Sequence, residues 1–443
     1  MDRENRTLLL ISVSIVFVVA LILYFQPFFL RGWILNLENG KYDREVRHYY
    51  QPLPPHPSIV IVDVDDRSIA EEGKWPWNRA KIAQLTEKLT RLGASVLAFD
   101  IVFSEAQPNP VDAILPAVQD PQLAQELEEL KPRLDTDTVL AEAFKKSQST
   151  LGFAFASNGK KEGELPPPLL TLSPEQMEKT LIPAMNGYIG NQPLFQQAAH
   201  HAGFINAMVD SDGILRFSPL VLRDQEKVYP ALALQAAQLY LNTPFSGLIF
   251  STARKHQVME GIQFGSTFIP TDPWGRILIP FRGPPYSFPY LSATDLLHGK
   301  IAPEQVQGKL VFIGLSSTAA SDLFATAISP VFPGVEVQAS IASGILYNYL
   351  PYKPNWGRGA AVALVLILGT LAALIFPFIS QIYAFLISFS IIAILEAINY
   401  WFWTRHGMVL SFFFPTPTLA SLFALDLISI YLSHRRRNKK EGK

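Results

Sequence analysis

Residues 58–103 decide the fold, with SIVIVDVDD (58–66) and SVLAFDIVF (95–103) flanking RAKIAQLTEKLTRLG (79–93). Both flanking runs are continuously apolar, which is typical of strands buried on both faces of a parallel sheet. In the middle segment, apolar residues recur at Ile82, Leu85, Leu89 and Leu92, which predicts an amphipathic helix that Gly93 ends. This strand–helix–strand unit predicts an α/β domain with a mixed, largely parallel sheet.

Further elements of the same domain follow along the chain. An amphipathic segment, Thr138–Lys146, precedes a strand at Leu151–Phe155, and the apolar run Lys309–Leu315 precedes a helix at Val335–Tyr349. Glycines that favour positive φ predict turns at Asp212-Gly213 and Trp274-Gly275. The predicted hairpin strands beside these turns are Phe204–Val209, Ile214–Leu222 and Arg276–Ile279. The polar, proline-containing stretches Glu105–Leu134 and Pro166–Pro168 are interpreted as surface insertions.

An apolar run near the N-terminus, residues 7–30, is long enough to cross a hydrocarbon core of about 30 Å. The competing interpretation is a cleaved signal peptide, which would end in a small-x-small site. The run ends instead in LYFQPFF (23–29), which offers no such site. We therefore predict an uncleaved anchor helix.

Three more spans are expected in the C-terminal part, at Arg358–Phe378, Gln381–Trp403 and Met408–Leu432. The tail 433–443 is basic, and lysine and arginine beside a span favour the cytoplasmic side. Four spans then place both termini in the cytoplasm and the intervening chain outside it. The expected organisation is an anchor at 7–30, an extracytoplasmic domain at 31–357, a three-helix bundle at 358–432 and a cytoplasmic tail at 433–443.

Two acidic residues, Glu396 and Asp426, fall within predicted spans, where ionisable groups are costly and often functional. They belong at different depths, so pairing between them is not expected, and hydrogen bonding within the bundle is the plainer interpretation. Two pairs of small residues, Gly359 with Ala363 and Gly369 with Ala373, allow close helix packing within one subunit or between two. A homodimer is therefore expected.

Composition excludes several functions. The 443 residues contain no cysteine, which rules out disulfides, thiolate nucleophiles and cysteine-ligated zinc. The formal net charge of −1 gives no global field for nucleic acid. The sequence GLSST (314–318) does not complete a G-x-S-x-G elbow, and neither a phosphate-binding loop nor a dinucleotide fingerprint occurs. The chain is predicted not to be an enzyme, and no cofactor is expected.

An ordered set of motifs resembles the CHASE domain, type two, an extracytoplasmic sensory module of bacterial receptors. The matching segments are VDVDDRSI (62–69), GKWPWNR (73–79), GA (93–94), AFDIVF (98–103), GFIN (203–206), DSDGILR (210–216), YPALAL (229–234), RGP (282–284), GKLVFIG (308–314), Asp322 and PGVEVQA (333–339).

This resemblance implies a sensor in the bacterial cytoplasmic (inner) membrane, surrounded by membrane lipids. Members of that family usually continue after the last helix into an output domain, a nucleotide cyclase, diguanylate cyclase or kinase. This sequence departs there, with only the short tail. The stimulus would then be relayed to a separate signalling enzyme or to an output domain absent from a truncated chain. The alternative is a non-enzymatic envelope scaffold that binds another envelope protein or a wall polymer.

Candidate ligand-binding residues lie where parallel strands end, because ligands bind at the carboxyl edge of such sheets. Carboxylates there could hold Mg²⁺ or Ca²⁺, with Asp65, Asp66 and Asp100 as candidate ligands, or bind a cationic or hydroxylated ligand. The structural alternative is that these aspartates cap helices, tie turns and pair with Arg79 or Arg67. The two tryptophans either line a pocket or plug the domain. The full candidate set is Asp63, Asp65, Asp66, Trp75, Trp77, Arg79, Asp100, Ser316, Ser317 and Asp322.

Overall fold

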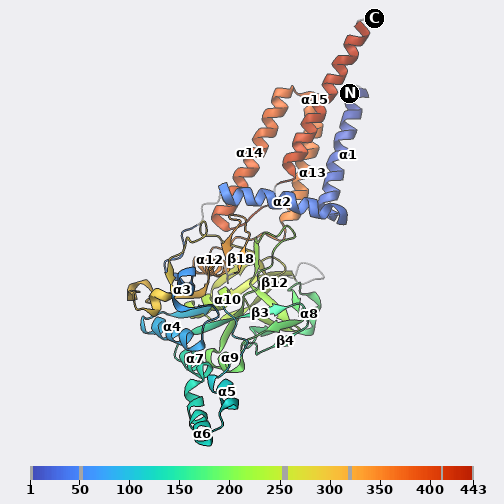
Figure 1. Cartoon of the computed structure of the whole chain (residues 1–443). Helices are drawn as coiled ribbons and strands as arrows, with labels where there is room; N and C mark the ends of the chain where they lie inside the picture. The colour runs from blue at the N-terminus through green and yellow to red at the C-terminus, as the bar shows by residue number, and fades with distance from the viewer. Residues whose placement is uncertain (1–2, 49–52, 252–257, 318–321, 411–412, 442–443) are drawn as a thin grey trace. The chain divides into compact units, whose positions relative to one another are not determined.

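Figure 1 shows the computed structural model, which describes residues 3–48, 53–251, 258–317, 322–410 and 413–441. The chain divides into two compact units. The helical unit comprises Met1–Tyr50 and Pro351–Lys443, and the α/β unit comprises Gln51–Leu350. The α/β unit lies within the predicted exterior domain of 31–357 and is shorter than it at both ends. Residues 442 and 443 of the predicted tail lie outside the described residues.

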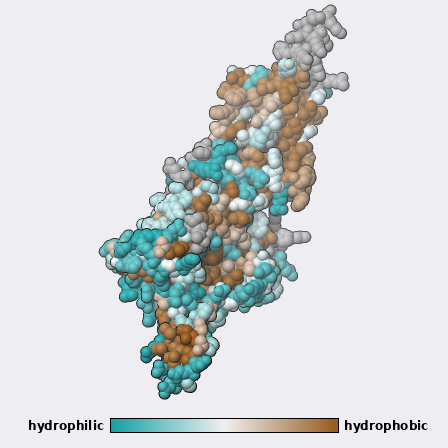
Figure 2. Space-filling view, viewed as in Figure 1, coloured by the Kyte–Doolittle hydropathy of each residue, from teal (hydrophilic) through white to brown (hydrophobic). Residues whose placement is uncertain are grey.

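The helical unit contains long helices whose outer surfaces are apolar (Figure 2). Its helices are α1 (Arg3–Phe25), α2 (Phe28–His48), α13 (Gly357–Ile375), α14 (Gln381–His406) and α15 (Pro415–Glu441), with a short 3₁₀ segment, η4 (Phe376–Phe378), after α13. Among the described residues, four stretches are long and apolar enough to cross a membrane: Arg6–Phe25, Gly357–Phe378, Gln381–His406 and Pro415–Leu432. Their apolar residues remain exposed, Phe389 at 62% for example, as lipid-facing side chains would be.

Helix α1 ends earlier than predicted, at Phe25. Pro27 disfavours the helical conformation of the residue before it, and Gln26 adopts a φ of 42°. A second helix, α2, begins at Phe28 and runs to His48. The prediction of one helix over 7–30 was therefore wrong at its end, since the last apolar residues belong to a helix that the sequence interpretation did not recognise.

Helices α13 and α14 agree with the predicted spans to within a few residues. The third predicted span, Met408–Leu432, was placed too early, because α15 begins at Pro415. Residues 407–409 instead pair with the chain that leads into α13. The amide of Tyr352 donates to the carbonyl of Gly407 at 2.8 Å, and the amide of Val409 donates to the carbonyl of Tyr352 at 2.9 Å.

Small residues let α1 and α13 approach closely. A Cβ atom added at Gly369 would lie 2.7 Å from Cγ2 of Val16, which is itself 1% exposed. The pair Gly369 and Ala373 is therefore used for packing within one chain. The other pair, Gly359 and Ala363, is exposed on α13.

The α/β unit is built on a sheet whose parallel core has the strand order β16–β1–β17–β2–β3–β8. These strands are β1 (Ile59–Val64), β2 (Val96–Phe99), β3 (Ser149–Ala156), β8 (His201–Phe204), β16 (Tyr290–Ser292) and β17 (Leu310–Leu315); β7 (Gly187–Ile189) adds antiparallel to β3, and β4 (Lys161–Glu162) pairs with β7. Every residue of β1 is buried, so both faces of the sheet are covered. This confirms the mixed, largely parallel α/β fold that the sequence predicts.

Helices pack in two groups against this sheet. One group comprises α3 (Asp66–Glu72), α4 (Arg79–Arg91), α7 (Thr136–Lys145), α9 (Pro193–Ala199) and α11 (Ala293–Leu297), and the other comprises α10 (Leu232–Leu241) and α12 (Gly334–Leu346). The predicted apolar face of α4 is buried, and Gly93 follows with a φ of 84°. Val335 of α12 crosses directly over Gly314 of β17, where an added Cβ would lie 2.7 Å away. This contact sets α12 at the carboxyl edge of the sheet.

The predicted turns form, but one predicted hairpin does not. Gly213 and Gly275 have φ values of 80° and 75°. Strand β8 pairs with β3, whereas the strand after Gly213 pairs with the strand after Gly275, so the two segments beside Asp212-Gly213 are not partners. Four smaller sheets complete the described part of the α/β unit. The first contains β5 (Leu170–Thr171), β11 (Lys227–Pro230), β10 (Val221–Asp224) and β6 (Ala184–Met185), and the second contains β12 (Phe245–Ser251), β13 (Val258–Phe264) and β14 (Thr267–Pro270). The third pairs β9 (Phe217–Pro219) with β15 (Arg276–Leu278), and the fourth pairs β18 (Leu323–Phe324) with β19 (Phe332–Pro333).

The predicted insertion Glu105–Leu134 lies on the surface of the α/β unit and contains helices. Its elements are α5 (Pro110–Ile114), η1 (Leu115–Ala117), α6 (Pro121–Leu130) and η2 (Lys131–Leu134), and the remaining short helices of the unit are α8 (Pro174–Lys179) and η3 (Pro303–Gln305). Figure 2 shows apolar side chains gathered where α5 and α6 lie. Ile114 and Leu123 there are 51% and 45% exposed.

Candidate functional site

The carboxyl ends of the parallel strands meet at one edge of the sheet, where the sequence predicts the site. Asp63 lies in β1 and Asp65 directly follows it, Asp100 follows β2, and Ser316 follows β17. β17 pairs with β1 on one side and with β2 on the other. Two groups of side chains form along this edge, one around Asp100 and the other around Asp63.

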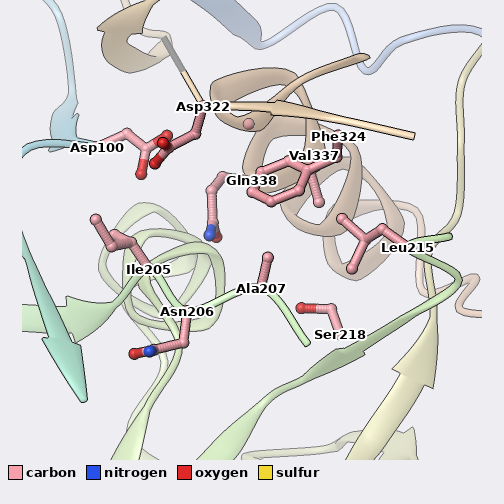
Figure 3. A pocket seen from close by; sticks show the side chains of 11 residues that line it. Asp100, Ile205, Asn206, Ala207, Leu215, Ser218, Asp322, Phe324, Val337 and Gln338 are labelled. Carbon is pink, nitrogen blue, oxygen red and sulfur yellow. The ribbon is translucent and has the colours of Figure 1, made fainter. Parts of the chain in front are cut away.

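The group around Asp100 lines a small hollow that is partly open to solvent. Figure 3 shows the carboxylates of Asp100 and Asp322 facing each other, with Gln338 beside them. The residues that line it are Asp100, Ile205, Asn206, Ala207, Leu215, Ser218, Asp322, Phe324, Gly334, Val337 and Gln338. The pocket thus combines an apolar wall with carboxylate, amide and hydroxyl groups, a mixture typical of small-molecule sites.

Burial and then the nearby Asp322 raise the pKa of Asp100 to about 7. Two facing carboxylates repel each other when both are ionised, so one holds a proton or a cation lies between them. The arrangement therefore favours a positively charged group in the pocket.

The amide side chains of the pocket are fixed by the fold. Asn206 donates to the carbonyl of Phe155 at 2.8 Å and accepts from its amide at 2.7 Å. Gln338 is 7% exposed and accepts from the amide of Ala233 at 3.1 Å, which connects α12 to α10. These residues, together with Ser218, were not singled out from the sequence, although Asn206 and Gln338 occur in the motifs GFIN and PGVEVQA.

The group around Asp63 joins β1 to the loop after β17. Asp63 accepts from the amide of Ser316 at 2.9 Å and from its hydroxyl, and Asp66 accepts from the hydroxyl of Ser317 at 2.7 Å. Burial raises the pKa of Asp63 to about 6, against the lowering effect of the Ser316 hydrogen bonds. Asp65 caps α3 by accepting from the amide of Ser68 at 2.7 Å. These contacts fit the structural interpretation, in which the carboxylates cap a helix and tie a loop.

Trp75, Trp77 and Arg79 do not line the pocket. Trp77 is 4% exposed and its indole donates to the carbonyl of Gly73 at 2.9 Å, which is the plugging role considered from the sequence. Trp75 packs edge-on against it.

The expected pairing of a strand-end aspartate with Arg79 or Arg67 was wrong. Arg79 lies 3.7 Å from Asp137 and over the ring of Phe103. Arg67 pairs with Asp295 at 2.8 Å. Arg67 lies in the first turn of α3 and Arg79 begins α4, and each pairs with an acidic residue of another helix, Asp295 of α11 and Asp137 of α7.

The proposed metal ligands Asp65, Asp66 and Asp100 are divided between the two groups. Among the described residues, no group of three or more histidine or acidic side chains is arranged to hold a metal ion. The reason is local: Asp65 and Asp66 are engaged at the start of α3, whereas Asp100 faces Asp322. The metal site stays a prediction from the sequence without geometric support.

Glu396 and Asp426 have different surroundings within the helical unit. Glu396 accepts from the ammonium of Lys41 on α2 at 2.8 Å. Asp426 of α15 is 4% exposed, inside the bundle. As expected, Glu396 finds its partner within the helical unit, but that partner comes from the unrecognised helix α2.

We expect the α/β unit to be more stable near pH 5 than near pH 8. With raised pKa values, Asp63 and Asp100 keep protons in the folded state that the unfolded chain has already released. This contribution is complete below about pH 4 and is lost as the pH rises to about 7, at up to about 1.4 kcal/mol per pH unit for each group.

Urea unfolding of the full chain across this pH range measures the effect. Asp100→Asn, which is neutral at every pH, should flatten the dependence. Asp120→Asn, which retains a cap on the exposed start of α6, is the matched control. An Asp100→Asn variant with the wild-type pH dependence would show that Asp100 is ionised in the folded protein throughout.

Comparison with known proteins gives one match. The model of the CHASE2 domain family matches residues 15–374. No curated protein matches the chain, and no solved structure does.

Proposed function

Because the chain belongs to the CHASE2 domain family, whose domains are extracytoplasmic and sensory, we propose that its α/β unit binds a small cationic solute and relays the binding through the helices. The α/β unit then lies outside the cytoplasmic membrane, with both termini in the cytoplasm. The carrying observation is the pocket in which Asp100 and Asp322 face each other (Figure 3). Asn206, Ser218 and Gln338 add hydrogen-bonding groups that select among cations by shape. Neither a metal ion nor a catalytic step is part of this proposal.

The relay has a structural basis where the two ends of the α/β unit join the helical unit. We call this region the junction, and it comprises Lys41, Tyr42, Glu45, Tyr352, Lys353, Glu396, Asn399, Trp403 and Gly407–Leu410. The incoming chain, α2, is held to α14 by Lys41 with Glu396 and by Asn399, which donates to Glu45 at 3.0 Å. The outgoing chain is held by Tyr352, which pairs with Gly407 and Val409.

Both connections to the α/β unit therefore end on the same part of α14. Tyr42 stacks on Trp403 with ring centroids 5.7 Å apart, and the amide of Leu410 donates to Asn399 at 3.0 Å. A ligand shifts such an equilibrium only by binding two arrangements with different affinity. Movement of either connection would change the contacts of α14, and through α14 would reach a cytoplasmic partner enzyme.

Binding is tested by thermal unfolding of the full chain in lipid nanodiscs with butane-1,4-diamine, Mg²⁺ or Ca²⁺. We expect saturable stabilisation by the diamine, and its loss in the double variant Asp100→Asn/Asp322→Asn. Asp120→Asn serves as the control for a change of one exposed charge. Equal stabilisation of wild type and double variant would place the binding elsewhere, and stabilisation by a metal ion alone would restore the metal hypothesis.

A homodimer remains part of the proposal. It is supported by the exposed pair Gly359 and Ala363 on α13, which leaves room for a close helix neighbour. Single-particle mass measurement in nanodiscs distinguishes a dimer from a monomer, and a monomer at every concentration would reject it.

A further inference from the structure

Helix α2 is joined to the membrane-spanning part of α1 by Gln26 and Pro27 alone. Since the span ends at Phe25, the first turn of α2 has to lie within a few ångströms of the end of that span. The helix is too polar to be a span itself, with Arg31, Glu38, Lys41, Asp43, Glu45 and two further arginines among its 21 residues. Figure 1 shows α2 running across the helices of the helical unit instead of alongside them.

One face of α2 is fixed against the bundle. Ile34 is 1% exposed and belongs to the apolar cluster formed with residues of α1, α13, α14 and α15. Lys41 contacts Glu45 at 3.3 Å and Glu396 at 2.8 Å on this side. These contacts determine which residues of α2 point away from the bundle.

The first half of the helix exposes large aromatic side chains. Phe28, Phe29 and Trp33 are 95%, 80% and 62% exposed. Burying one such side chain is worth about 1.5–3 kcal/mol, so leaving three of them in water would be costly. The same helix exposes Arg31 and Arg44. Aromatic and basic residues are both enriched where a chain meets the membrane–water interface.

We propose that α2 lies in the plane of the membrane surface, with Phe28, Phe29 and Trp33 inserted at the boundary between lipid headgroups and acyl chains. Lipid is the occupant of this face because α2 begins where a span ends. Arg31 and Arg44 contact headgroup phosphates. This inference goes beyond the sensory function and does not depend on the ligand; it depends only on the four spans crossing the membrane.

The absence of cysteine from the sequence allows a direct test. A nitroxide is attached to single cysteines at Phe29→Cys and Trp33→Cys in the full chain, reconstituted in vesicles of phosphatidylcholine and phosphatidylglycerol. Collision rates with oxygen and with an aqueous nickel chelate give the depth of each label. Glu87→Cys, at an exposed position of α4, is the aqueous reference, and Phe389→Cys, at a 62% exposed position of α14, is the acyl-chain reference.

Labels at positions 29 and 33 should collide with nickel several-fold less than the Glu87 label and with oxygen more. Their depth should be about 5–10 Å below the phosphates and shallower than that of the Phe389 label. Nickel collisions equal to those of the Glu87 label would place this face in water. Protection from both reagents would mean that protein, such as a second copy, covers it. Either result overturns the proposal, whereas an aqueous Phe389 label would instead overturn the membrane spans.

Discussion

Replacing Arg216 by methionine should destabilise the α/β unit by about 3 kcal/mol, the low end of the cost of breaking a buried ion pair. The side chain of Arg216 is 2% exposed and binds Asp210 and Asp212, each at 2.8 Å. Removing the guanidinium leaves two carboxylates without their cation. The cost stays at the low end because these carboxylates are 20% and 32% exposed and can be partly hydrated.

Removing Arg216 should also weaken ligand binding in the pocket around Asp100. The side chain of Arg216 fixes the turn at Asp210–Gly213. The segment after this turn is bonded to two other segments of the protein: the amide of Leu215 donates to the carbonyl of Ala325 at 2.7 Å, and the amide of Ile279 donates to the carbonyl of Arg216 at 3.0 Å. Leu215 lines the pocket. A variant with a loosened turn should therefore bind the diamine more weakly, even at temperatures at which it is folded.

Urea unfolding of the full chain measures the first effect. Arg91→Met is the matched control, because Arg91 is 71% exposed and its pair with Glu87 is worth at most about 1 kcal/mol. The triple variant Asp210→Asn/Asp212→Asn/Arg216→Met should regain part of the stability, since it contains no uncompensated charge. A triple variant less stable than Arg216→Met would show that the turn depends on hydrogen-bond geometry more than on charge.

The parallel sheet was predictable because each of its central strands is a continuous apolar run. Residues 59–64 and 310–314 are buried, so both faces of these strands are covered, and this burial removes the alternation seen in half-exposed strands. The hairpin predicted at Asp212-Gly213 does not form. A glycine specifies the turn, but the strands beside it pair with more distant partners, which local sequence does not encode.

The sequence also predicted only some of the residues that line the candidate site. Asp100 was identified because it ends a predicted parallel strand, and Asp322 because it follows the last apolar strand run, whose end was expected at the same edge. Asn206 and Gln338 were missed because one follows a strand whose neighbour is far away in sequence and the other lies within a buried helix. An amide side chain in an apolar helix was the available signal for Gln338, since burial of that group requires a partner.

Helix α2 was missed for a different reason. Its apolar, aromatic and charged residues follow no clear helical period, so neither a span nor an amphipathic helix is indicated by periodicity. Pro27 was the available signal, since the residue before a proline is a probable helix boundary. Without α2, the partner of Glu396 could not be identified.

The second large effect is expected at Lys41, which lies between two carboxylates of the junction. Glu45 and Glu396 are both within 3.3 Å of its ammonium. Burial raises the pKa of Glu45, and Lys41 opposes that shift. Lys41→Met should weaken the attachment of α2 to α14 by about 3 kcal/mol, the low end for a buried pair, because it leaves the buried carboxylate of Glu45 without its cation whereas the more exposed Glu396 can be hydrated.

Glu396→Gln should have a much smaller effect, although it breaks the shorter of the two contacts. Lys41 and Glu45 then balance each other, and the amide can still accept a hydrogen bond. The side chain of Glu396 is also 43% exposed, against 10% for Glu45, so solvent screens the attraction between Glu396 and Lys41 more strongly than that between Glu45 and Lys41. Which of the two variants weakens the attachment of α2 more therefore tests whether Lys41 acts by compensating charge or only by making one hydrogen bond.

Detachment of α2 is measured by the reactivity of a single cysteine at Ile34→Cys, which is buried in the bundle at 1% exposure. Its modification by a water-soluble maleimide should become many-fold faster with Lys41→Met, little faster with Glu396→Gln, and unchanged with Arg44→Met, an exposed cation on the same helix. If the junction transmits binding, the diamine should also change this rate in the wild-type background and lose that influence in Lys41→Met. A diamine effect of the same size in Lys41→Met would mean that the signal passes through Tyr352 and the outgoing chain, because that connection reaches α14 without involving α2.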